Sequence, residues 1–167
     1  MTEPRLEDLA LVFPGARAVL EKAGQAPART LATAESCTGG LLAAALTAVP
    51  GSSASFLGGV VAYANSLKLG TLGVPTELLE SYGAVSREVA ESMAVGVRDR
   101  FHSSFGISTT GVAGPASSES KPAGLIFVAV AGADGTVVRQ MVRDEGRHKN
   151  RVRAVTVALE LLQAALN

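Results

Sequence analysis

The chain lacks several of the residues on which structural cross-links and metal centres depend. In 167 residues it has no tryptophan, one cysteine and two histidines. One cysteine cannot form an internal disulfide, and so few cysteine and histidine side chains are poor material for a closed zinc site. We therefore expect a protein without a disulfide, a structural metal or a cofactor.

Net charge and long apolar runs are also missing. Fifteen basic residues balance fifteen acidic ones, so no overall field favours a nucleic-acid backbone, and a small ligand is the better expectation. The first residues, MTEPRLEDLALVFPG, contain acids and a proline where a signal peptide has a basic flank and an apolar run. Because no apolar stretch reaches the roughly 18 residues of a membrane span, we expect a soluble, cytoplasmic protein without a membrane partner.

Hydrophobic periodicity predicts alternating helices and strands along the whole chain. Residues 5–23 have helical spacing, and Pro14 predicts either two short helices or one kinked helix. Strands are expected at 30–34, 56–64, 105–110, 125–130 and 136–142, the last two joined as a hairpin through Gly132-Ala133-Asp134-Gly135. Helices are expected at 41–49, 66–72, 75–82, 86–101 and 148–166.

This order of elements predicts the fold class. The β-branched and aromatic content of 56–64 indicates a central strand, and Ser86 is the expected N-cap of the helix that follows it. Helix-connected and hairpin-connected strands together predict one α/β domain over residues 1–167, a three-layer α-β-α sandwich with a mixed sheet.

Ser53, Tyr63 and Lys68 form the densest group of side chains that could carry out chemistry. A serine hydroxyl needs a base to become a nucleophile, and with so few histidines a lysine is the plausible base. Burial beside a tyrosine hydroxyl would favour the neutral amine that this role requires. Spacing alone favours the plainer alternative, in which the serine caps a turn, the tyrosine belongs to a strand and the lysine is solvated.

Two polar turns and a basic helix are candidate binding elements. Residues 35–40, ESCTGG, follow a predicted strand and either bind a phosphate or polar base, or simply cap the next helix. Gly111–Pro115 is a second turn of this kind, or only a tight connection. Arg147 and Arg151 form either a phosphate fork or a solvated helix face. Cys37 is expected to be a packed thiol rather than a nucleophile.

Several ordered segments resemble the C-terminal domain of the competence/damage-inducible protein CinA. They are TAESCTGG, PGSS, VVAYANSLK, LGV, YGAVS, TTGVAGP, KPAGLIFVAVAG and the late Arg147, over residues 7–165. Stand-alone, PncC-type members of this family are nicotinamide-nucleotide amidohydrolases, which release ammonia and leave nicotinic acid mononucleotide. The resemblance therefore implies deamidation of nicotinamide mononucleotide.

The resemblance also implies a set of site residues. The family's catalytic serine, tyrosine and lysine fall on Ser53, Tyr63 and Lys68. The positions expected to line the nucleotide pocket are Ser36, Thr38, Gly39, Thr110, Gly111, Gly114 and Arg147. The resemblance, together with the many small residues, favours a homodimer or a higher homo-oligomer.

The chain departs from the family pattern between residues 116 and 120. Relatives often have a glycine-rich stretch before Lys-Pro, whereas this chain has Ala116-Ser117-Ser118-Glu119-Ser120, whose side chains restrict the backbone. Altered activity or substrate choice is therefore an open alternative, as is a domain that binds a nucleotide without cutting it. A third alternative is a non-enzymatic module that acts in competence or recombination through a recombination-protein partner.

Overall fold

A computed structural model describes residues 8–167 of the chain. Its first helices are α1 (Asp8–Val12) and α2 (Pro14–Ala23), so Pro14 starts a second helix, as one of the two predicted arrangements requires. Residues 5–7 of the predicted N-terminal helix lie outside the described residues. None of the helices in the described part of the chain is long and apolar enough to cross a membrane.

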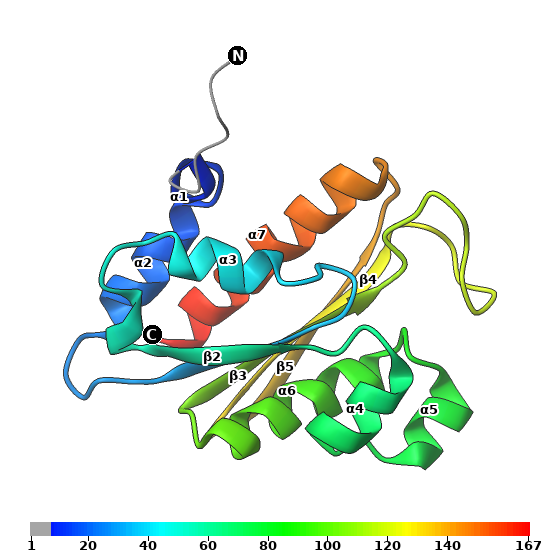
Figure 1. The fold of residues 1–167 in the computed structure, drawn as a ribbon, viewed down its shortest axis with the longest axis horizontal. Coiled ribbons are helices and arrows are strands. Elements are labelled where there is room, and N and C mark those ends of the chain that lie inside the picture. The colour runs from blue at the N-terminus through cyan, green and yellow to red at the C-terminus, as the bar shows by residue number, and fades with distance from the viewer. Residues whose placement is uncertain (1–7) are drawn as a thin grey trace.

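A five-stranded mixed sheet forms the middle layer (Figure 1). Its strands are β1 (Leu31–Glu35), β2 (Phe56–Val61), β3 (Phe105–Gly111), β4 (Leu125–Gly132) and β5 (Gly135–Val142), in the order β2-β1-β3-β4-β5. Strand β1 pairs in parallel with β2 and β3, whereas β4 pairs antiparallel with β3 and β5. The mixed sheet and the hairpin between β4 and β5 are confirmed.

Strand β2 lies at the edge of the sheet, so the prediction of a central strand at 56–64 is wrong. Its burial alternates, and Leu57 and Val61 are each almost half exposed, whereas all five residues of β1 are buried. A high β-branched and aromatic content favours strands of both kinds and does not distinguish an edge strand from a central one.

Helices cover both faces of the sheet and complete the predicted three layers. The remaining elements are α3 (Leu41–Thr47), η1 (Ser52–Ala54), α4 (Asn65–Leu72), α5 (Thr76–Tyr82), α6 (Arg87–Phe101) and α7 (Arg147–Ala165). Ser86 caps α6 as predicted, because its hydroxyl accepts the N–H of Val89 at 3.3 Å.

Successive side chains along β4 point into two different hydrophobic clusters. Ile126, Val128 and Val130 face a core shared with α2, α3 and α7, while Phe127, Ala129 and Ala131 face α6. Small residues let α6 approach closely: a Cβ at Gly106 would clash with the carbonyl oxygen of Ala94.

The parallel strands determine where a site can form. Because β1, β2 and β3 run in the same direction, the segments that follow them emerge together at the carboxyl ends of these strands. The β1–α3 turn, the β2–α4 connection and the segment after β3 meet there.

Candidate active site

A cavity of about 260 Å³ opens beyond the carboxyl ends of β1, β2 and β3. Ser36 lines it from the turn after β1, Tyr63 and Lys68 from the segment after β2, and Thr110 from the end of β3. Of the other residues singled out in the sequence, Gly111, Gly114 and Arg147 also line the cavity. Loops beyond the carboxyl ends of parallel strands are where open α/β sheets bind ligands.

Lys68 is a buried amine at the inner side of this cavity, only 1% exposed. Its Nζ donates to the carbonyl oxygen of Ala62 at 3.1 Å and to Oδ1 of Asn65 at 3.4 Å. Asn65 and Lys68 are one helical turn apart at the start of α4, so they lie on one face. Burial lowers the pKa of Lys68 below its usual 10.5, and the negative charge of Glu119 opposes this shift. The amine therefore loses its proton more readily than a surface lysine does.

Tyr63 and Arg147 close another side of the cavity. Arg147, the first residue of α7, donates from Nη2 to the Tyr63 hydroxyl and from Nη1 to the carbonyl oxygen of Gly114, both at 3.1 Å. Asn150, 1% exposed, fixes the start of α7: its Nδ2 donates to Ala113 at 3.0 Å. The helix and the turn after β3 are thus joined by side-chain hydrogen bonds.

The turn after β1 carries Ser36 and is held by the carboxylate of Glu35. Glu35 is 1% exposed and accepts the Thr38 hydroxyl at 2.7 Å. It also accepts the N–H groups of Gly40 and Leu42 at 3.0 Å and of Ala43 at 2.8 Å. The protein's own carboxylate therefore takes the place at the start of α3 that an anionic ligand would need.

The sequence prediction for this turn is corrected at two positions. Thr38 is fully buried, and its hydroxyl donates to Glu35 and lies 2.6 Å from Oγ1 of Thr109. Neither Thr38 nor Gly39 is among the residues that line the cavity, whereas Ser36 is. Of the two interpretations of residues 35–40, the capped helix start describes Thr38 and Gly39, whereas Ser36 and its neighbour Cys37 line the cavity.

Ser53 is not part of this cavity, which contradicts its predicted position beside Lys68. It is exposed in η1, before β2 begins, whereas Tyr63 and Lys68 follow the end of β2. A six-residue strand lies between them, and six residues of strand span about 20 Å. Ser53 therefore lies at the amino end of β2, at the opposite end of the strand from Tyr63 and Lys68.

The other candidates have more local roles. Arg151 donates to the Thr38 carbonyl oxygen at 2.7 Å, so it does not form a fork with Arg147. Cys37 is buried, as expected, and burial raises its pKa to about 12, which keeps the thiol protonated. Thr110 lines the cavity, but its hydroxyl donates to the Ala84 carbonyl oxygen at 2.7 Å.

The sequence analysis assigned no individual role to three residues of this region: Glu35, Asn65 and Glu119. Asn65 had a detectable signal, since its spacing to Lys68 is that of neighbours on a helix face. Glu35 sits directly at the end of a predicted strand, before a helix, where a carboxylate can reach the N-terminal amides. Glu119 had no such signal, because its position depends on contacts between distant segments.

The structure is an α/β domain with a cavity beyond the carboxyl ends of its parallel strands. The family model for the CinA C-terminal domain matches residues 15–166. The chain therefore belongs to the CinA C-terminal domain family.

Relatives and solved structures agree with this assignment. The chain is 50% identical over 137 residues to a CinA-like protein of Frankia casuarinae, covering 82% of this chain and 32% of the relative. A CinA-like protein of a Synechococcus species is 49% identical over 154 residues, covering 90% of this chain and 36% of that protein. The chain thus spans about a third of the length of these curated relatives.

Among solved structures, the competence/damage inducible protein CihA of Agrobacterium tumefaciens matches with a TM-score of 0.86 and 40% identity. The match covers 100% of this chain and 99% of that one. The competence damage-inducible protein A of Klebsiella pneumoniae matches with a TM-score of 0.83 and 31% identity, over 98% of each chain.

Proposed function

We propose that this protein is an amidohydrolase that deamidates nicotinamide mononucleotide, with Ser36, Lys68 and Tyr63 as its catalytic residues. The observation that carries the proposal is that a serine hydroxyl, a buried lysine amine and a tyrosine hydroxyl line one cavity. These are the groups that a serine–lysine hydrolase needs. The substrate comes from the resemblance to the stand-alone, deamidating members of the family.

Ser36 takes the place of Ser53 as nucleophile in this proposal. It follows β1 directly, and its N–H donates to the carbonyl oxygen of Thr109 at 2.9 Å, which fixes the backbone of the turn. Ser53 is separated from Lys68 by the length of β2 and cannot exchange a proton with it within one chain.

The reaction proceeds in two steps through an acyl-enzyme. Neutral Lys68, assisted by the Tyr63 hydroxyl, takes the proton of the Ser36 hydroxyl while the serine oxygen attacks the carboxamide carbon, and backbone N–H groups stabilise the oxyanion. The C–N bond then breaks, and the leaving nitrogen receives the proton and departs as ammonia. Water, deprotonated by the same amine, hydrolyses the nicotinoyl ester and restores the serine.

Arg147 is the residue that best fits the phosphate of the substrate. Its guanidinium lines the cavity beside Tyr63 and is held by a backbone carbonyl, so it is presented in a defined orientation. Planar guanidinium groups bind phosphate oxygens well. The amides at the start of α3 are not available for this task, because Glu35 accepts from them.

The proposal is tested by measuring ammonia release from nicotinamide mononucleotide by the wild type, Ser36→Ala and Ser53→Ala. The two variants make the same chemical change at opposite ends of the parallel strands. Ser36→Ala is expected to lower kcat by about three orders of magnitude or more, as loss of a nucleophile does. Ser53→Ala is expected to stay within about twofold of the wild type.

Two results would contradict parts of the proposal. Absence of ammonia release by the folded wild-type protein would remove the deamidase function. Wild-type turnover by Ser36→Ala together with loss of turnover in Ser53→Ala would keep the function and reverse the assignment of the nucleophile.

A further inference from the structure

The segment that departs from the family pattern forms a tight turn at the cavity. Ser118 and Lys121 pair through two backbone hydrogen bonds of 3.1 and 2.8 Å. The residues between them, Glu119 and Ser120, have φ angles of 51° and 59°. Two successive non-glycine residues in the left-handed region are unfavourable, and such conformations persist where surrounding contacts hold them.

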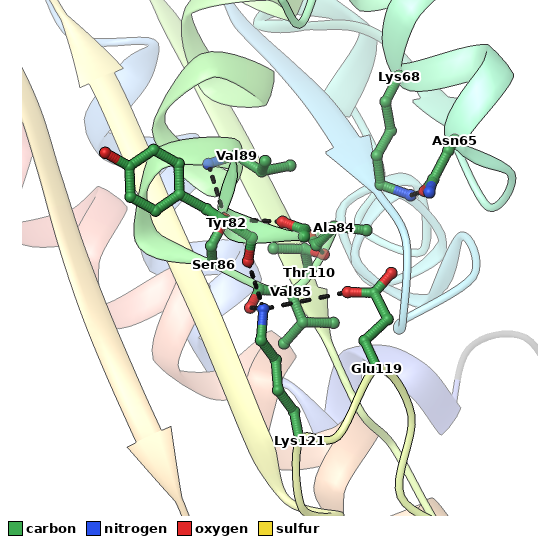
Figure 2. A network of polar contacts seen from close by, with 11 residues as sticks. Asn65, Lys68, Tyr82, Ala84, Val85, Ser86, Val89, Thr110, Glu119 and Lys121 are labelled. Atoms are coloured by element: carbon green, nitrogen blue, oxygen red, sulfur yellow. Dashed lines mark hydrogen bonds and ion pairs between the residues drawn. The ribbon is translucent and has the colours of Figure 1, made fainter. Parts of the chain in front are cut away.

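Lys121 supplies those contacts (Figure 2). Its Nζ donates to the carbonyl oxygens of Tyr82 at 2.5 Å and Val85 at 2.6 Å, at the end of α5 and before α6. Glu119 Oε2 lies 4.0 Å from the same amine. Gly83 leaves the room for this arrangement, since a Cβ there would lie 2.6 Å from Glu119 Oε2. The carboxylate is therefore held against the wall of the cavity.

Glu119 changes the charge balance of the cavity. Among the described residues that line it, Glu119 is the single acid, while Lys68 and Arg147 are basic. Figure 2 shows its carboxylate between Lys68 and Lys121, and its charge acts on the Lys68 amine. Lys121 donates to two carbonyl oxygens and lies 4.0 Å from Glu119 Oε2, so the carboxylate receives no direct hydrogen bond from this amine.

We propose that Glu119 is a specificity residue that favours the neutral carboxamide over the carboxylate formed from it, an inference that rests on the proposed function. A carboxylate accepts N–H donors, which the carboxamide has and the carboxylate product lacks. Without Glu119, Arg147 and the protonated form of Lys68 would bind a product that carries both a phosphate and a carboxylate more tightly than the substrate. An acid in the wall opposes the second negative charge and promotes product release.

The test compares binding of nicotinamide mononucleotide and nicotinic acid mononucleotide by calorimetry. Ser36→Ala is the background, because it prevents turnover and leaves the charges of the cavity unchanged. Adding Glu119→Gln, which is isosteric, should tighten binding of the carboxylate compound about fivefold or more and change carboxamide binding about twofold or less. With Ser36 intact, the same substitution should increase inhibition by the product to a similar extent.

Glu160→Gln is the matched control, since Glu160 is an exposed acid outside the cavity that pairs with Arg139. It should leave both affinities unchanged. An unchanged ratio of the two affinities in Glu119→Gln would overturn the inference, and so would an equal loss of both. If the background variant binds neither compound, the proposed function fails as well, which separates that outcome from a failure of the inference alone.

Discussion

Replacing Glu35 with glutamine should destabilise the fold much more than an ordinary loss of one acid. The carboxylate accepts four hydrogen bonds in a buried position, three of them from backbone N–H groups at the start of α3. Glutamine has nearly the same shape, so the change removes acceptor capacity and charge without opening a cavity.

The magnitude follows from the two carboxylate oxygens. A glutamine oxygen at the position of Oε2 keeps the partners Thr38, Gly40 and Leu42, but its NH₂ then faces the N–H of Ala43. One charge-assisted bond is lost, a buried donor is left unpaired, and the other bonds become neutral ones. Together these changes cost about 3 kcal/mol, because bonds to charged groups contribute about 1.5–3 kcal/mol each. For a domain of this size that cost lowers Tm by roughly 6–12 °C.

Urea unfolding followed by circular dichroism measures this loss, with Glu160→Gln as the control. The ion pair of Glu160 with Arg139 is 3.1 Å long and about half exposed on both sides, so its loss should cost at most about 1 kcal/mol. The reasoning is refuted if the free energy of unfolding of Glu35→Gln falls by no more than that of the control.

Two further predictions concern the groups around the cavity. Because burial lowers the pKa of Lys68, the neutral amine should accumulate as pH rises, and kcat/KM for deamidation should increase with a midpoint below the usual lysine value of 10.5. A rise centred at or above 10.5 would show that Lys68 is not the base. Asn150→Ala should raise KM about tenfold or more while kcat changes less, because Asn150 positions the start of α7 and with it Arg147. A loss confined to kcat in steady-state kinetics would contradict this role.

The secondary structure was largely predictable because it depends on local patterns. Pro14 divides the first two helices, Ser86 caps α6, and residues 132–135 form the hairpin turn, each for a reason contained in a few neighbouring residues. The edge position of β2 was not predictable in this way. It depends on which strands pair, and pairing joins residues far apart in the sequence.

The same distinction explains the misplaced nucleophile. Ser53 is closer to Lys68 in the sequence than Ser36 is. The whole length of β2 nevertheless separates them, because Ser53 precedes this strand and Lys68 follows it. Parallel pairing aligns Glu35 with Val61, the last residues of β1 and β2, so the residues that follow the two strands lie close together. For a parallel sheet, the end of the strand at which a residue stands therefore matters more than its spacing along the chain.

Glu35 and Ser36 connect the stability of the fold with its proposed chemistry. They are consecutive at the end of β1, where successive side chains point to opposite sides. The first is buried beneath the start of α3, and the second lines the cavity. The hydrogen bonds of Glu35 thus hold the turn whose geometry presents the Ser36 hydroxyl. We therefore expect Glu35→Gln to slow deamidation even under conditions in which the variant is fully folded, because a nucleophile displaced by a fraction of an ångström reacts more slowly.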